Sequence, residues 1–219
     1  MKLELIFLGP PACGKGTQTN KLSEYLGFPH IDTGSLLRAE IAKETEDGKI
    51  AKTYIDKGHL VPPELVGSII KNRLWQEDCN NGYVLDGYPR SMEQAILLDK
   101  INSEIDKKSN AVFKAIYFDI DTQVLIERII HRQSCPKCGA IYNKKFRPAK
   151  IENICDICNI ELKTRADDNE TIAKARFETY YRETAPLIDF YKKKGVLYKI
   201  DANGTIDEVW QRLLAIIEK

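Results

Sequence analysis

The stretch Leu3-Glu-Leu-Ile-Phe-Leu-Gly9-Pro-Pro-Ala-Cys-Gly14-Lys15-Gly16-Thr17-Gln18 decides the interpretation of the whole chain. Its apolar run predicts a buried strand, and the periodic segment 16–26 predicts a helix. The Gly-x4-Gly-Lys between them can curl its backbone N–H groups around an anion at the helix N-terminus. Lys15 can then reach terminal phosphates, and the Thr17 hydroxyl can lie beside Mg²⁺. The competing interpretation is a Gly-rich turn with a chance lysine, which the agreement of strand, spacing, lysine and threonine disfavours.

Composition excludes several classes of protein. The 219 residues are 43% hydrophobic and 30% charged, as in an ordinary globular protein. The net charge of +1 gives no overall field that would attract nucleic acid or a membrane surface. No apolar run is long enough to cross a membrane, and the run 5–8 is too short for a signal peptide. We therefore expect a cytoplasmic protein that uses neither a membrane nor nucleic acid.

Strand and helix patterns alternate along the chain, which predicts an α/β fold with a parallel sheet covered on both faces. A polar turn is expected at 43–48, and a segment without helical periodicity at 133–165. The expected strands are 3–8, a short extended piece within 27–34, 83–86, 111–118 and 196–200. The expected helices are 16–26, 35–42, 50–56, 63–75, 91–102, 121–132, 168–194 with a bend or restart at Pro186, and 205–219.

Four of the six cysteines form two C-x2-C pairs, Cys135 with Cys138 and Cys155 with Cys158. The sixteen residues between the pairs fall within the spacing typical of a four-thiolate zinc site. Four protein ligands leave no open coordination position, so the sequence predicts structural zinc, or a substituting metal such as iron. Disulfides or unrelated thiols are the alternatives. The absence of a secretory signal argues against a disulfide scaffold.

Arginine makes up only 10 of the 33 basic residues, so its positions are informative. Arginine binds phosphate oxygens in bidentate fashion, which suits a site that holds two nucleotides. Surface arginines in weak ion pairs are the alternative for any one of them. The arginines in question are Arg38, Arg90, Arg128, Arg132, Arg165 and Arg176.

Together these motifs resemble the adenylate kinase family of nucleoside monophosphate kinases, in the long form with a zinc-bearing lid. The similarity runs in order from residue 3 to about 210, and its GKGT and DGYPR motifs are highly specific. The matching pieces are Gly9 to Thr17, Asp32-Thr33-Gly34 with Leu37-Arg38, Gly58 to Pro62, Asp86 to Arg90 with Gln94, Arg128 with Arg132, Thr164-Arg165 with Asp167-Asp168, Arg176, and Thr184 to Ile188.

The resemblance implies a P-loop fold of three layers with a parallel sheet flanked by helices and two small inserts. The core would comprise 1–31, 62–131 and 169–219, the helical AMP-binding insert 32–61, and the zinc-binding lid 132–168. The implied reaction is reversible Mg²⁺-dependent phosphoryl transfer, ATP + AMP ⇌ 2 ADP, which maintains adenine nucleotide balance. A monomer is the family default.

The resemblance also implies a role for each matching residue. Thr17 and Asp86 would hold Mg²⁺ through water, and Gln94 would contact the adenine of AMP. The residues expected to act in catalysis are Lys15, Arg90, Arg132, Arg165 and Arg176. The expected ATP-binding residues are Ala12, Cys13, Gly14, Lys15, Gly16, Thr17, Arg128, Arg132, Ile141, Tyr142 and Ile206. The expected AMP-binding residues are Thr33, Arg38, His59, Leu60, Val61, Gly87, Tyr88, Pro89, Arg90, Gln94, Arg165 and Arg176.

The sequence departs from the family pattern at Ala12, which replaces a usual glycine, and at Cys13, which replaces a usual alanine or serine. Both residues are small, so we expect the phosphate-binding loop to keep its shape. Cys13 is either an inert small residue or a thiol made reactive by the helix N-terminus. Two other functions stay open: a UMP/CMP or GMP kinase of the same fold, and a zinc-ribbon ATPase that binds nucleic acid.

Overall fold

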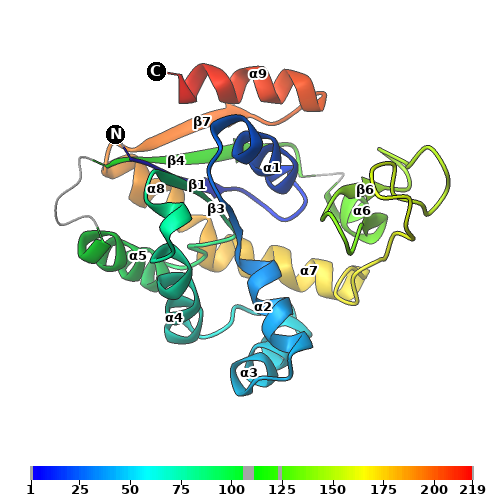
Figure 1. Cartoon of the computed structure of the whole chain (residues 1–219), viewed down its shortest axis with the longest axis horizontal. Coiled ribbons are helices and arrows are strands. Elements are labelled where there is room, and N and C mark those ends of the chain that lie inside the picture. Colours follow the sequence, from blue (N-terminus) through cyan, green and yellow to red (C-terminus); the bar gives the residue numbers. More distant parts are fainter. Residues whose placement is uncertain (1, 106–110, 123–124, 219) are drawn as a thin grey trace.

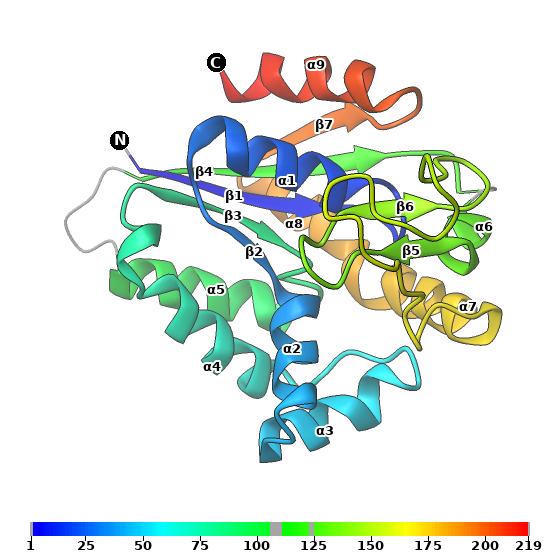
Figure 2. The same ribbon diagram turned by 45° about the vertical axis from the view of Figure 1, so that its right-hand side comes forward.

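A five-stranded parallel sheet forms the centre of the molecule (Figures 1 and 2). The computed structural model describes residues 2–105, 111–122 and 125–218. The strand order is β2-β3-β1-β4-β7, with β1 in the middle. The strands are β1 (Leu3–Leu8), β2 (His30–Asp32), β3 (Gly82–Asp86), β4 (Val112–Asp119) and β7 (Leu197–Asp201). The predicted parallel α/β architecture is confirmed.

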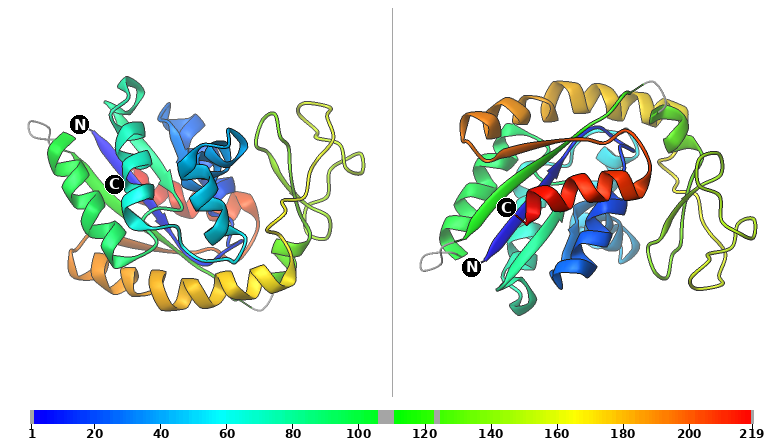
Figure 3. Two further views of the ribbon diagram at one scale, coloured as in Figure 1. Left: turned by 90° about the horizontal axis from the view of Figure 1, so that it is seen from below. Right: turned by 90° about the horizontal axis from the view of Figure 1, so that it is seen from above.

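Helices cover both faces of the sheet, which gives three layers (Figure 3). In β1, Leu5 and Phe7 pack with α1 and α9, whereas Ile6 and Leu8 pack with α4, α5 and α8 on the opposite face. The strand therefore reads as continuously apolar instead of alternating, as parallel strands buried on both faces do. The covering helices are α1 (Lys15–Leu26), α4 (Pro63–Leu74), α5 (Met92–Ile105), α8 (Pro186–Lys193) and α9 (Ile206–Ile217).

A helical segment, residues 33–61, connects β2 to α4 and contains α2 (Thr33–Ala42) and α3 (Glu46–Ile55). The polar turn predicted at 43–48 is wrong in its second half, because α3 already begins at Glu46. The Thr45 side chain caps this helix by accepting a hydrogen bond of 3.0 Å from the Gly48 amide. A side-chain carbon on Gly48 would lie 2.2 Å from the Glu40 carbonyl oxygen, so the two helices cross at backbone contact.

The cysteine segment, residues 132–168, has little regular structure (Figure 2). Its β5 (Arg132–Ser134) and β6 (Ile141–Asn143) pair in antiparallel fashion, and the rest is turns and isolated bridges. The helix predicted at 121–132 is too long: α6 covers Leu125–Ile130, and positions 123–124 lie outside the described residues. Arg132 pairs with Asn143 in the β5–β6 ladder, so it does not share a helix with Arg128 as expected.

The chain then returns to the core through a long helical stretch. It consists of α7 (Glu170–Thr179), a π-helical turn η2 (Tyr180–Thr184) and α8, which begins at Pro186 as predicted. A capping box of Thr205 and Glu208 opens α9, which lies within the helix predicted at 205–219. A short 3-10 turn, η1 (Glu77–Cys79), precedes β3. None of the helices within the described residues has the length and apolar character needed to cross a membrane.

Candidate active site

The phosphate-binding loop follows β1 at the carboxyl edge of the sheet. Gly9 and Gly14 have φ angles of 147° and 97°, which glycine adopts readily. Gly14 is the N-cap of α1, and no side chain caps this helix, so its first N–H groups face the loop. The Lys15 ammonium donates hydrogen bonds of 2.7 Å and 2.9 Å to the carbonyls of Gly9 and Pro10. The loop thus presents N–H groups, a helix N-terminus and one ammonium group, which suit an anion.

The neighbouring strand β3 delivers Asp86 to the same edge. Its carboxylate oxygen lies 3.6 Å from Nε2 of His30 and accepts a 3.5 Å hydrogen bond from the Thr19 hydroxyl. The same carboxylate oxygen lies 3.5 Å from where a side-chain carbon on Gly16 would stand. Glycine at 16 therefore keeps open the space between the loop and Asp86. A carboxylate beside a phosphate cradle is a donor set that Mg²⁺ prefers, so these residues fit a magnesium site.

The turn after β3 holds Arg90 in place. Gly87 has a φ of 77°, and its carbonyl accepts a 2.7 Å hydrogen bond from the Arg90 guanidinium. The Arg90 amide donates to the side-chain oxygen of Gln94 at 2.8 Å, and the Arg90 carbonyl accepts from the Thr184 hydroxyl at 2.7 Å. Burial lowers the pKa of Arg90, opposed by the charges of Asp32 and Asp86. The arginine is thus fixed at both backbone and side chain.

Asp32 at the end of β2 organises the third part of the edge. Its carboxylate caps α2 by accepting 3.1 Å hydrogen bonds from the amides of Gly34 and Ser35, and it pairs with Arg38 at 3.2 Å. Burial would raise the pKa of Asp32, but the Ser35 hydroxyl and the charges of Arg38 and Arg165 outweigh it, so the net shift is downward. Asp32 is thereby kept ionised and orients Arg38.

Two aspartates hold the arginines that come from the opposite side. Nε and Nη2 of Arg132 each donate a hydrogen bond to the Asp168 carboxylate, the first at 2.8 Å, and the Asp168 side chain is fully buried. Arg176 lies 3.3 Å from Asp167 and 3.4 Å from Asp168. The guanidinium of Arg165 completes this group.

The arginines repel one another. Burial, with the charges of Arg132 and Arg38, lowers the pKa of Arg165 to about 10. Burial, with Arg132 and Arg90, lowers the pKa of Arg176 to about 10. Both groups stay charged at neutral pH, since the lowered values are still far above 7. Burial is the larger cause of both pKa shifts, and repulsion from the neighbouring arginines adds to it. The region is therefore strongly disposed to bind phosphate.

These groups border one continuous cleft of about 1390 Å³. A cavity for a single drug-sized ligand has roughly 300 to 1,000 Å³, so this cleft has room for two such molecules. The buried Thr33 hydroxyl at its border has no hydrogen-bond partner among the described residues. An arginine-rich space with a phosphate loop at one end and a polar pocket at the other suits transfer between two phosphorylated ligands.

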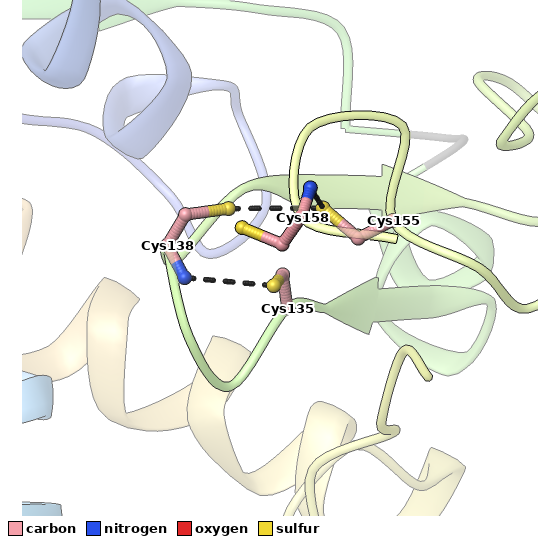
Figure 4. A group of neighbouring side chains, drawn as sticks. All are labelled: Cys135, Cys138, Cys155 and Cys158. Carbon is pink, nitrogen blue, oxygen red and sulfur yellow. Dashed lines mark hydrogen bonds between the residues drawn. The ribbon is translucent and has the colours of Figure 1, made fainter. Parts of the chain in front are cut away.

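The four cysteines lie together at the edge of the cysteine segment (Figure 4). All four sulfur atoms are within 4.8 Å of one another, and those of Cys138 and Cys155 are 3.7 Å apart. Two sulfurs at about 2.3 Å from one tetrahedral zinc ion would have nearly that separation. Burial would raise the pKa of Cys155, but backbone N–H groups of Cys158 and Ile157 and the Tyr142 hydroxyl lower it to about 6. The cluster therefore fits a tetrahedral metal ion.

Comparison with known proteins agrees with this geometry. The profile of the family described as Adenylate kinase matches residues 7–196. An adenylate kinase of Archaeoglobus fulgidus is 46% identical and covers 99% of both chains. One of Caldanaerobacter subterraneus subsp. tengcongensis is 44% identical over 95% of this chain and 93% of its own. One of Thermodesulfovibrio yellowstonii is 44% identical over 99% of this chain and all of its own length.

The chain belongs to the adenylate kinase family. The residues for which the family resemblance predicts a nucleotide-binding role all border the cleft, except Tyr88. The Tyr88 side chain is fully buried in the apolar cluster with α4 and α5, and burial raises the pKa of its hydroxyl. The ring is therefore part of the apolar core and does not border the cleft.

Three other residues that the adenylate kinase motifs assign to ATP binding make contacts within the protein or are buried. The Tyr142 hydroxyl points into the cysteine segment, where it accepts a 2.9 Å hydrogen bond from the Asp156 amide and lies 3.7 Å from the Cys155 sulfur. The Ile206 carbonyl already accepts a 2.8 Å hydrogen bond from Gln18. Cys13 is only 2% exposed, which favours the inert interpretation over the reactive one.

Sequence reasoning assigned no function to several side chains that adjoin the predicted site. His30 and Thr19 pair with Asp86, and their spacing in the sequence gives no sign of this contact. Phe146 borders the cleft next to Arg128, whose guanidinium carbon lies 5.8 Å from the ring centre. Thr179 and Thr184 also border the cleft. For Thr184 a signal existed, because it opens the matching piece Thr184 to Ile188.

Proposed function

We propose that this member of the adenylate kinase family catalyses ATP + AMP ⇌ 2 ADP with Mg²⁺, and that ATP occupies the phosphate-loop end of the cleft. The observation that carries the proposal is one continuous cleft that is bordered both by the loop of Lys15 and by the pocket of Thr33 and Arg38. Seven further arginines border the same cleft, among them Arg90, Arg132, Arg165 and Arg176. Phosphoryl transfer spreads negative charge over equatorial oxygens and needs positioning and cations more than a nucleophilic side chain.

Each group has a defined task in this mechanism. Lys15, which now bonds to the carbonyls of Gly9 and Pro10, exchanges these partners for phosphate oxygens. Arg90 holds the phosphate of AMP from a position fixed by Gly87 and Gln94. Arg132, Arg165 and Arg176 neutralise the charge that develops between the two nucleotides. Asp86 and the Thr17 hydroxyl would hold Mg²⁺ through water, and the bound ion would supply positive charge to the phosphates.

We also propose that the segments bordering the cleft act as two moving inserts, the AMP-binding insert 32–61 and the zinc-binding lid 132–168. Closure would exclude water, which otherwise competes as phosphoryl acceptor. Zinc at Cys135, Cys138, Cys155 and Cys158 would hold the lid together, because the segment has only a small apolar cluster of its own. One chain supplies every residue of the proposed site, which supports a monomer. None of the six cysteines forms a disulfide, which supports a cytoplasmic location.

The test is a coupled assay for ADP formation with ATP, Mg²⁺ and each nucleoside monophosphate in turn, with and without added RNA. The kcat/KM for AMP should exceed that for each other monophosphate by at least about tenfold, because a site that hydrogen-bonds one base discriminates against the others. A higher kcat/KM with UMP, CMP or GMP than with AMP would show that the protein is a kinase for that nucleoside monophosphate instead. ATP hydrolysis stimulated by RNA, without an acceptor nucleotide, would favour the zinc-ribbon ATPase.

A further inference from the structure

A buried hydrogen bond joins two segments that lie far apart in the sequence. The Thr179 hydroxyl on α7 donates to the carbonyl of Gly58 at 3.2 Å, across 121 positions of the chain. Thr179 is 5% exposed. Gly58 lies in the loop after α3, which returns the helical segment 33–61 to the core. Figure 3 (left) shows α7 extending from the core toward the cysteine segment, with the helical segment beside it.

The backbone of Gly58 rests directly on α7. A side-chain carbon on Gly58 would lie 3.1 Å from Cβ of Ala175 and 3.1 Å from the carbonyl oxygen of Ile172. Its φ of 72° is also in the left-handed region that favours glycine. Close packing and the hydrogen bond are therefore two separate contacts that fix the same peptide on the same helix.

Among the described residues, the polar groups of the Gly58 peptide make one hydrogen bond to α7, the bond from Thr179. The Gly58 amide donates to the Ile55 carbonyl at 2.9 Å, and the His59 amide donates to the Tyr54 carbonyl at 3.0 Å, both within the helical segment. The hydrogen bond from Thr179 therefore joins this turn to α7, in addition to the packing against Ala175 and Ile172. The next residues, His59 to Val61, border the cleft.

Thr179 stands one helical turn after Arg176, so the two side chains lie on the same face of α7. Arg176 faces the cleft beside Asp167 and Asp168. One face of α7 thus presents a phosphate-binding group to the cleft and a hydroxyl to the loop that borders the AMP pocket. The Thr179 contact thus joins the face of α7 that carries Arg176 to the loop that leads into residues 59–61.

We propose that Thr179 is a positioning residue for the acceptor nucleotide: its hydroxyl fixes the Gly58 peptide, and hence the backbone 59–61, relative to Arg176. The resemblance to the family did not single out Thr179. The inference rests on the proposed function, because it takes 59–61 as part of the AMP pocket. It concerns the acceptor only, since none of these contacts involves the phosphate-binding loop or α9.

The test compares the variants Thr179→Val and Thr179→Ser with the wild type. Valine keeps the size of threonine and removes the donor, which leaves the buried Gly58 carbonyl unpaired. A buried hydrogen bond of this kind corresponds to roughly a fivefold to tenfold change in an equilibrium constant. We expect the KM and the calorimetric Kd for AMP to rise by about that factor, with the KM for ATP unchanged within about twofold. Serine restores the donor and should restore both values.

A matched control and a second measurement separate positioning from general damage to the fold. Thr171→Val makes the same substitution at an exposed position of α7 and should change neither KM nor stability. Hydrogen exchange of the amides at 57–61 should increase in Thr179→Val, while exchange in the phosphate-binding loop stays constant. Gly58→Ala, which forces a carbon against Ala175, should raise the KM for AMP at least as much.

The outcomes distinguish this inference from the proposed function. If the wild type forms no ADP from ATP and AMP, the proposed function is wrong. If the wild type is active and Thr179→Val leaves the KM for AMP unchanged, Thr179 does not position the acceptor. The inference would also be overturned if Thr179→Val raised the KM for ATP as much as the KM for AMP, or if Thr179→Ser gave the same KM values as Thr179→Val.

Discussion

The two walls of the cleft hold similar charged groups by different means. The core wall, with Lys15, Asp86 and Arg90, follows β1 and β3, which are hydrogen-bonded on both sides and buried in apolar clusters. The lid wall, with Arg132 and Arg165, comes from the cysteine segment. That segment buries a cluster of only four residues, two of which are cysteines.

The two walls therefore depend on different interactions for their stability. The core wall rests on the hydrophobic burial of the whole sheet, so a change at its surface should affect chemistry and leave the fold intact. The lid wall rests on the sulfur cluster and on the ion pair of Arg132 with Asp168. A change there should affect structure and chemistry together. Each of the following experiments tests one side of this contrast.

The largest effect is expected at the core wall. Lys15→Met and Arg90→Ala each remove a cation that stabilises the charge of the transferred phosphoryl group. We expect kcat/KM to fall by roughly a thousandfold or more. The melting temperature should stay within a few degrees of the wild type, because both side chains border the cleft and neither belongs to an apolar cluster of the core. The control is Arg182→Ala, which removes an exposed arginine that pairs with the neighbouring Glu183. Near-normal activity of either cleft variant would refute the assigned roles.

The next effect concerns the lid wall. Cys155→Ser, or chelation of the metal from reduced protein, removes the link that closes the cysteine segment. Metal binding at such sites contributes on the order of 10 kcal/mol to local folding. We expect residues 132–163 to lose protection from hydrogen exchange, with activity reduced at least about tenfold, while the helical segment 33–61 keeps its protection.

A cysteine outside the cluster provides the control for that experiment. Cys79 is buried next to Arg73 and far along the chain from the other four, so Cys79→Ser should retain one zinc per chain by metal analysis. Burial raises the pKa of Cys79 to about 11, so this thiol stays protonated at neutral pH. A metal-free, reduced protein with unchanged melting temperature and exchange would contradict the structural role of the metal.

The same contrast explains how far the sequence alone predicts the structure. The sheet, the phosphate-binding loop and the sulfur cluster could be predicted, because each is encoded in local pattern: apolar runs, glycine spacing and C-x2-C pairs. The final helix was predicted as well, since its capping box lies within four residues. These features depend on neighbours along the chain.

Features that depend on distant residues could not be predicted. Helical periodicity places Arg132 on the helix with Arg128, but pairing with Asn143 and the buried Asp168 draws it into β5. The motif that contains Tyr88 suggests nucleotide binding, yet the packing of α4 and α5 encloses its ring. The contact of Thr179 with Gly58 spans 121 positions and has no local signature.

The ion pair of the lid wall gives a smaller effect than the metal. In Asp168→Asn the amide keeps the size of the side chain but cannot balance the charges of Arg132 and Arg176. Breaking a buried pair costs roughly 3 to 5 kcal/mol, and access of both arginines to the cleft should reduce this to about 1 to 3. Denaturant unfolding should show the loss, with kcat reduced about tenfold. Asp167→Asn removes one contact of 3.3 Å with Arg176 and should lower the free energy of unfolding by less than Asp168→Asn does. Equal decreases in the free energy of unfolding would contradict the greater importance of Asp168.

The smallest effect is expected in the phosphate-binding loop itself. Ala12, which stands where the family usually has glycine, has a φ of 61°. A left-handed alanine costs about 1 to 2 kcal/mol, and glycine adds about 0.5 to 1 kcal/mol of chain entropy on folding, so Ala12→Gly should stabilise the protein by up to about 1 kcal/mol. In a chain of this size that corresponds to a rise of about 2 to 4 °C in the melting temperature.

The control for Ala12→Gly is Ala39→Gly, at an exposed position inside α2, where glycine should lower stability by about 1 kcal/mol. Opposite signs for the two alanine-to-glycine changes would attribute the strain to the loop conformation. Equal destabilisation would mean that the left-handed alanine is not strained. Activity should change little in Ala12→Gly, because the core wall is positioned by the sheet beneath the loop, and this separates loop strain from the chemistry of Lys15.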